Sequence, residues 1–61
     1  RLQPTDLEVL FNLGAIYEAQ GRLNDAMSAY KRILAVDPDN ARAADAHLRA
    51  SMKKLESKVG K

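Results

Sequence analysis

Apolar residues recur every three or four positions near the start of the chain, which is the spacing of one face of an α-helix. The first such face consists of Leu7, Leu10, Phe11, Gly14 and Tyr17. Val9, Leu13 and Ile16 widen the apolar arc beyond that face. A helix with so wide an apolar arc is expected to have neighbours on more than one side.

Two further segments each carry an apolar face. In the second segment it consists of Leu23, Ala26, Met27, Tyr30, Ile33 and Leu34. In the third it is a narrower stripe made of Ala41, Ala44, Leu48, Met52, Leu55 and Val59. We therefore predict an all-α fold with helices near residues 6–20, 24–36 and 41–58. Asp45 and Arg49, one turn apart, are expected to pair on the wet side of the third helix.

The first helix carries its own boundary and packing signals. Thr5 and Glu8 have the spacing of a capping box, which predicts that the helix opens at Thr5. Gly21 suits the left-handed conformation that ends many helices. Gly14 lies inside the helix, where glycine costs about 1 kcal/mol relative to alanine. A close approach of two helices would explain it, and we predict that Gly14 faces Ala26.

The later boundaries also reveal an internal period. Asn24 is the predicted cap of the second helix, Pro38 ends that helix, and Asp39 or Asn40 caps the third. The junction at Pro38 consists of an apolar residue, a polar residue, proline and two capping residues. The same order surrounds Pro4, 34 residues earlier. A fixed period of this size indicates a repeat array.

These positions resemble the tetratricopeptide repeat. The residues that match its pattern are Leu10, where tryptophan is commonest, followed by Leu13, Gly14, Tyr17, Gly21, Ala26, Tyr30 and Pro38. Ile33 departs from the usual small residue. The resemblance covers residues 7–40 and implies a helix–turn–helix unit. Residues 1–6 resemble the end of a preceding repeat. The pattern fails over residues 41–61, which we interpret as a C-terminal capping helix.

Composition and charge narrow the possible functions. The 61 residues include no cysteine and one histidine, which excludes disulfides, thiolate zinc sites and histidine clusters. No apolar run is long enough to span a membrane. The capping helix ends in a basic segment, because residues 46–61 hold five Lys or Arg and one acid. No aromatic residue lies in this segment, so nucleic-acid binding is not expected.

No arrangement of residues predicts catalysis or cofactor binding. His47 and Ser51 lie one turn apart, but no oxyanion-stabilising device accompanies them. Residues 37–40 resemble the start of a calcium loop, yet Arg42 stands where that loop requires glycine. We expect no catalytic, cofactor-binding or metal-binding residues, and we predict that the chain is not an enzyme.

The resemblance implies a protein or peptide partner bound along the first helix. Carried over by position, the binding face consists of Glu8, Phe11, Asn12, Ala15, Glu18 and Ala19. In one subclass of the family, a Lys and an Asn on this face bind the terminal carboxylate of the ligand. Phe11 and Ala15 occupy those positions here, so the face is apolar and an apolar helix is the expected ligand. A basic ligand residue could face Glu8 or Glu18.

Two alternatives remain open at this point. Phe11 could instead pack inside the protein, against a neighbouring repeat. The chain could also be a structural module whose apolar faces join copies of itself, as a homodimer through the first helix, or join it to neighbouring repeats of a longer array.

Overall fold

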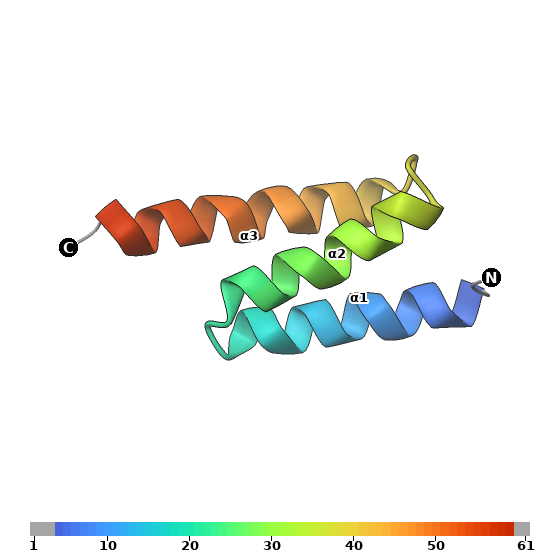
Figure 1. The fold of residues 1–61 in the computed structure, drawn as a ribbon, viewed down its shortest axis with the longest axis horizontal. Coiled ribbons are helices and arrows are strands. Elements are labelled where there is room, and N and C mark those ends of the chain that lie inside the picture. Colours follow the sequence, from blue (N-terminus) through green and yellow to red (C-terminus); the bar gives the residue numbers. More distant parts are fainter. Residues whose placement is uncertain (1–3, 60–61) are drawn as a thin grey trace.

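Three helices form the fold, and the computed structural model describes their backbone over residues 4–59 and their side chains over residues 6–56. They are α1 (Pro4–Ala19), α2 (Leu23–Val36) and α3 (Ala41–Val59). The middle helix α2 runs antiparallel to both neighbours and packs against each of them (Figure 1). The predicted all-α fold is confirmed, and every helix end lies within two residues of its predicted position.

The start of α1 differs from the prediction. The helix begins at Pro4, so Thr5 lies in its first turn and is not the N-cap. Proline is favoured at the first helical position, because its φ is already helical and its missing N–H would have had no partner there. The predicted remnant of a preceding repeat, residues 1–6, falls partly outside the described residues, and its last three residues belong to α1.

The end of α1 confirms the role of Gly21. This glycine adopts the left-handed conformation, with φ of 79°. Its N–H donates to the carbonyl of Glu18 at 3.0 Å, and the N–H of Arg22 donates to the carbonyl of Tyr17 at 2.8 Å. These two bonds form a Schellman motif, which satisfies the last carbonyls of the helix and turns the chain towards α2.

The other two helices begin in different ways. Arg22 occupies the N-cap position of α2 without a capping side-chain bond, so the prediction that Asn24 caps this helix is wrong. The Nε of Arg22 instead donates to Asp25 Oδ2 at 2.9 Å, across the first turn. Asn40 does cap α3, because its Oδ1 accepts the N–H of Ala43 at 2.9 Å.

The core is centred on α2. The buried apolar residues are Ala26, Ala29, Tyr30 and Ile33 of α2 and Ala43, Ala46 and Ala50 of α3. Around them pack the partly buried residues Leu7, Leu10, Phe11, Tyr17, Leu23, Met27 and Leu34. Tyr30 and Ile33 are the largest fully buried side chains among the described residues. The predicted apolar face of the second helix is therefore the centre of the fold.

The nearest neighbour of Gly14 across the helix crossing is the Tyr30 ring, whereas the prediction named Ala26. A Cβ added at Gly14 would lie 2.5 Å from Cε1 and 2.8 Å from Cζ of the Tyr30 ring. Both distances are below van der Waals contact. The glycine thus leaves room for a buried aromatic ring at the crossing of α1 and α2.

The buried face of α3 is the opposite of the one predicted. The small residues Ala43, Ala46 and Ala50 face the core, whereas the large apolar residues point outwards. Leu48 is 59% exposed, Met52 54% and Leu55 60%. The bulk of Tyr30 and Ile33 on α2 already fills the space between the helices, so only small side chains fit opposite them. The side chain of Val59, the last residue of the predicted stripe, lies outside the described residues.

Candidate functional site

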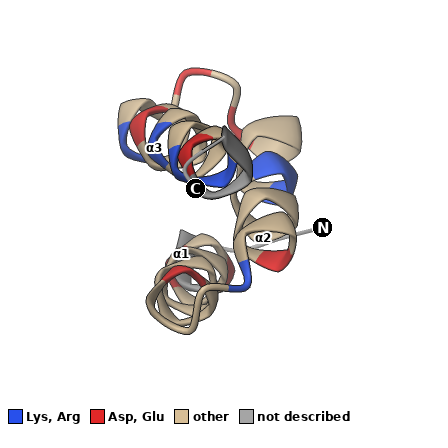
Figure 2. Cartoon of the chain, turned by 90° about the vertical axis from the view of Figure 1, so that its left-hand side faces the viewer, with Lys and Arg blue, Asp and Glu red and all other residues tan. Residues whose placement is uncertain are grey.

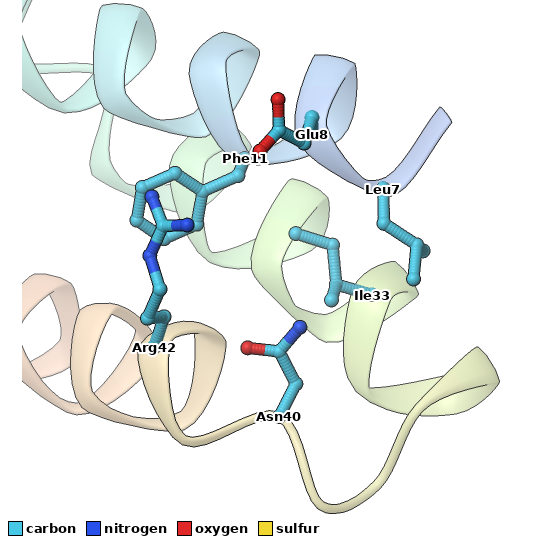
Figure 3. A pocket seen from close by; sticks show the side chains of 6 residues that line it. All are labelled: Leu7, Glu8, Phe11, Ile33, Asn40 and Arg42. Atoms are coloured by element: carbon cyan, nitrogen blue, oxygen red, sulfur yellow. The ribbon is translucent and has the colours of Figure 1, made fainter. Parts of the chain in front are cut away.

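A cleft of about 260 Å³ opens between the first part of α1 and the start of α3. Its lining residues are Leu7, Glu8 and Phe11 of α1, Ile33 of α2, Asn40 at the α3 cap and Arg42 of α3 (Figure 3). The apolar side chains form most of its wall, and Glu8 and Arg42 place one negative and one positive charge beside them. Such a cleft can hold an apolar side chain flanked by a polar or charged one.

Phe11 lines this cleft and also packs within the chain. Its ring centroid lies 5.6 Å from that of Tyr30, with the planes tilted by 50°. The guanidinium carbon of Arg42 lies 4.4 Å from the Phe11 ring centroid, in the geometry of a cation–π contact. The ring therefore packs against Tyr30 of its own repeat and at the same time lines the cleft. The internal packing holds the ring in place at the edge of the cleft.

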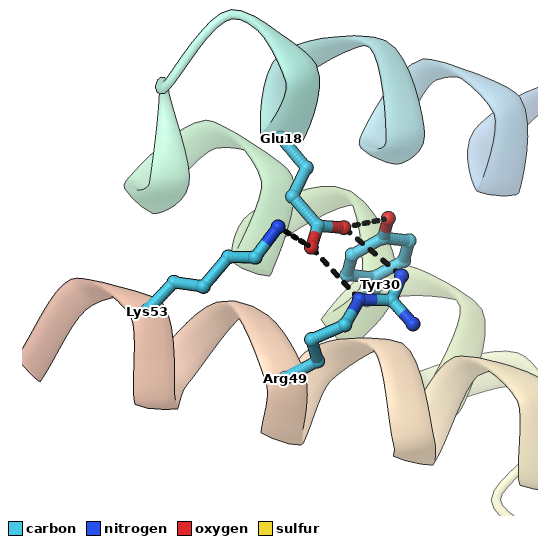
Figure 4. Close-up of polar contacts among 4 residues, drawn as sticks. All are labelled: Glu18, Tyr30, Arg49 and Lys53. Atoms are coloured by element: carbon cyan, nitrogen blue, oxygen red, sulfur yellow. Dashed lines mark hydrogen bonds and ion pairs between the residues drawn. The ribbon is translucent and has the colours of Figure 1, made fainter. Parts of the chain in front are cut away.

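Glu18 joins α1 to α3 through a cluster of polar contacts (Figure 4). Arg49 donates from Nε to Oε2 at 2.8 Å and from Nη2 to Oε1 at 3.1 Å. Lys53 Nζ lies 3.0 Å from Oε2. The hydroxyl of Tyr30 donates to Oε1 at 3.1 Å. Only 6% of the Glu18 side chain is exposed, so the carboxylate is enclosed by its donors.

The electrostatics of this cluster follow from these contacts. Hydrogen bonding to Arg49 is the main reason that the pKa of Glu18 falls from 4.5 to about 2, with Lys53 and Tyr30 adding to it against the effect of burial. Burial raises the pKa of Tyr30, and the bond to Glu18 raises it further. The pKa of Arg49 is also raised by Glu18. At neutral pH the cluster therefore holds one carboxylate between two cations.

The Glu18 cluster was not visible in the sequence. Arg49 was expected to pair with Asp45 one turn away, but its partner lies 31 residues away on another helix. Glu18 was expected to face a ligand. Its carboxylate is instead bonded inside the chain, so Glu8 is the acid of the predicted binding face that lines the cleft.

The other predicted residues take several positions. Asn12, Ala15 and Ala19 are exposed on α1. The residues of the repeat signature differ in burial. Gly14, Ala26 and Tyr30 are buried, and Leu10 and Tyr17 are partly buried. The exposed residues of the signature are Leu13, Gly21 and Pro38. Arg22 covers the Tyr17 ring at 4.8 Å from its centroid. The signature residues that are buried thus lie at the crossing of α1 and α2.

Within the described part of the chain, no three Asp, Glu, His or Cys residues are grouped in a way that could hold a metal ion. Between residues 4 and 59, no helix combines the length and the hydropathy needed to cross a membrane.

Comparison with known proteins gives one match. A family model described as the tetratricopeptide repeat matches residues 7–40, which is more than half of the chain. No curated protein and no solved structure matches. The matched segment holds α2 and nearly all of α1, together with the loop that leads to α3.

Proposed function

The chain belongs to the tetratricopeptide repeat family of protein–protein interaction modules, and we propose that it binds a peptide or an amphipathic helix of another protein along α1. The proposed binding face consists of Glu8, Phe11, Asn12, Ala15 and Ala19, without the predicted Glu18, whose carboxylate is bonded to Arg49 and Lys53. Repeats of this family are typically non-catalytic, and no catalytic family matches the chain.

The observation that carries this proposal is the apolar cleft at Phe11. The cleft is walled by Leu7 and Phe11 of α1 and Ile33 of α2, and Asn12 and Ala15 are exposed on α1. An apolar ligand side chain in the cleft would gain about 25 cal/mol for each Å² of apolar surface removed from water. Side chains of this kind serve as anchors in helix-in-groove recognition.

The charges around the cleft favour a particular ligand. Glu8 is exposed at its rim, whereas the Glu18 carboxylate is already bonded to Arg49 and Lys53. A basic residue of the ligand would therefore find its partner in Glu8. We expect ligands with one large apolar residue for the cleft and a Lys or Arg within one helical turn of it.

Selection from a displayed library of helical peptides tests this proposal. Peptides captured by the immobilised chain would be measured by fluorescence anisotropy against Ala15→Arg, which adds bulk and charge to the proposed face. Ala35→Arg is the matched control, because Ala35 is an exposed alanine of α2. We expect Ala15→Arg to weaken binding by about tenfold or more and the control to leave it unchanged.

Phe11→Ala and Lys31→Ala provide a second comparison. Phe11→Ala should weaken binding more than Lys31→Ala, since Lys31 is exposed on α2. Phe11 also packs against Tyr30, so circular dichroism must first show that the variant is folded at the assay temperature. Equal affinities for wild type, Ala15→Arg and Phe11→Ala would refute the assignment of this face.

A structural role is the second candidate function. It is favoured by apolar side chains on the outer side of α1, where Val9 is 62%, Leu13 38% and Ile16 53% exposed. Exposed groups of this kind mark interfaces in soluble proteins. They could join two copies as a homodimer through α1, or join α1 to a neighbouring repeat in a longer array.

A further inference from the structure

Two apolar stripes remain uncovered in the three-helix unit. The α1 stripe consists of Val9, Leu13 and Ile16, and the α3 stripe consists of Leu48, Met52 and Leu55. Each has the spacing i, i+4, i+7, which forms a straight row along a helix. The two rows therefore have the same length and the same form.

The two stripes lie on outer faces of different helices. Helix α2 packs against both α1 and α3, and the alanine face of α3 is turned towards α2 (Figure 1). The α3 stripe is on the other side of that helix, among Asp45, Arg49, Lys53 and Glu56. The α1 stripe faces away from Gly14, which contacts Tyr30 of α2. One chain therefore cannot bring its own two stripes together.

The charges of the two helices are opposite. Helix α1 contains Asp6, Glu8 and Glu18 and no Lys or Arg, but Glu18 is bonded to Arg49 and Lys53 within the chain, which leaves a charge of −2 on α1. Helix α3 contains five Lys or Arg against Asp45 and Glu56, and a charge of +2 remains once Glu18 is also counted against them. In Figure 2 α3 carries basic segments together with acidic ones and α2 also carries basic segments, whereas α1 carries acidic segments alone. Pairing α1 with α1, or α3 with α3, would bring like charges together.

We propose that the α3 stripe is a docking surface for the α1 stripe of a second copy of this chain. Apolar side chains meet apolar side chains in this arrangement, and an acidic helix meets a basic one. The inference deepens the second candidate function, on which it rests, by naming the partner surface. It does not require a ligand in the Phe11 cleft.

Such a contact is head-to-tail and has a consequence for assembly. Each added copy again presents a free α1 stripe at one end and a free α3 stripe at the other, so the contact does not close at two copies. The average mass should rise continuously with concentration instead of reaching the value for a dimer. Because the charges attract across solvent-exposed surfaces, added salt should weaken the association.

Complementary blocked variants test the proposal by sedimentation equilibrium of the full chain. Ile16→Asp blocks the α1 stripe and Met52→Asp blocks the α3 stripe, since each would bury an unpaired carboxylate in the contact. Both residues are more than half exposed, so neither change disturbs the core. Ala35→Asp, at an exposed alanine of α2, is the matched control.

The expected results distinguish head-to-tail contact from the alternatives. Each blocked variant alone should remain monomeric, and their mixture should form a 1:1 complex through the one intact pair of stripes. Wild type and Ala35→Asp should grow beyond a dimer as concentration rises. A dimer of Met52→Asp alone would overturn the proposal in favour of α1 pairing with α1, and a dimer of Ile16→Asp alone in favour of α3 pairing with α3.

Monomers of every species, mixed or not, at millimolar concentration would also overturn it. The peptide-binding measurement stays independent, because neither Ile16 nor Met52 lines the cleft. A failure of self-association is therefore distinguishable from a failure of the proposed ligand-binding function.

Discussion

Replacing Glu18 by Gln should destabilise the fold at neutral pH. The substitution keeps the size of the side chain but removes the charge that receives Arg49 and Lys53. It also places an amide N–H₂ group among their donors. The pKa of Glu18 falls from 4.5 to about 2 in the folded chain. At 1.36 kcal/mol for each pKa unit, this difference corresponds to at most about 3 kcal/mol.

Solvent screening reduces that figure. The Glu18 carboxylate is enclosed, but the side chains of Arg49 and Lys53 are about half exposed. Ion pairs with exposed partners are worth less than enclosed ones, so we expect a loss of about 1–2 kcal/mol. For a chain of this size, 1 kcal/mol shifts the melting temperature by about 4–8 °C. The Glu18→Gln variant should therefore melt about 5–15 °C below wild type at pH 7.

The pH dependence gives the sharper test. A carboxyl group with a lowered folded pKa stabilises the fold above its ordinary pKa, and this contribution is lost as the pH falls from about 4.5 towards 2. Thermal melts followed by circular dichroism should thus show a large gap between wild type and Glu18→Gln at pH 7 and a small one at pH 2. Glu8→Gln is the matched control and should show little difference at either pH. A gap at pH 7 no larger than that of Glu8→Gln, or one that persists at pH 2, would refute the reasoning.

Three further predictions concern helix packing and capping, and the first two use the same melts. Gly14→Ala should lower the free energy of unfolding by about 1–3 kcal/mol although alanine favours helices, because its Cβ would meet the Tyr30 ring at 2.5 Å. A melting temperature equal to or above that of wild type would contradict this prediction. Asn40→Ala should lower the free energy of unfolding by about 1 kcal/mol, because the Ala43 N–H loses its capping acceptor. Asp39→Ala is the comparison variant and should have a smaller effect. In the Asn40→Ala variant, loss of the cap should appear as faster amide hydrogen exchange in the first turn of α3. Uniform exchange along α3 would contradict this prediction.

Local signals in the sequence were sufficient for most of the fold. Gly21 and Asn40 act through bonds to residues only a few positions away, so their roles could be predicted without knowledge of the tertiary structure. The apolar face of α2 was also predicted, because a central helix buries its large side chains on both neighbours. The start of α1 was misplaced by two residues, since proline is compatible both with positions just before a helix and with its first turn.

The face of α3 could not be predicted from its own residues. A stripe with Leu48, Met52 and Leu55 is typical of a buried face, whereas the buried residues of α3, as far as its side chains are described, are all alanines. The choice depends on the volume that Tyr30 and Ile33 leave open, which is a property of α2. The bond between Glu18 and Arg49 was hidden for a similar reason. That bond forms between α1 and α3, which have few contacts with each other and are brought side by side because both pack against α2.

The alanine face of α3 has a consequence for how this helix is held along its axis. Methyl groups make low ridges, so they give close approach to α2 but little resistance to sliding by a fraction of a turn. Large interlocking side chains would fix that position in most helix pairs. In this chain the position of α3 along its axis is fixed by two polar contacts. They are the Asn40 cap at the start of the helix and the hydrogen bonds of Arg49 to Glu18 about two turns later. The longitudinal register of α3 is therefore set by directional hydrogen bonds, and the alanines set only its distance from α2.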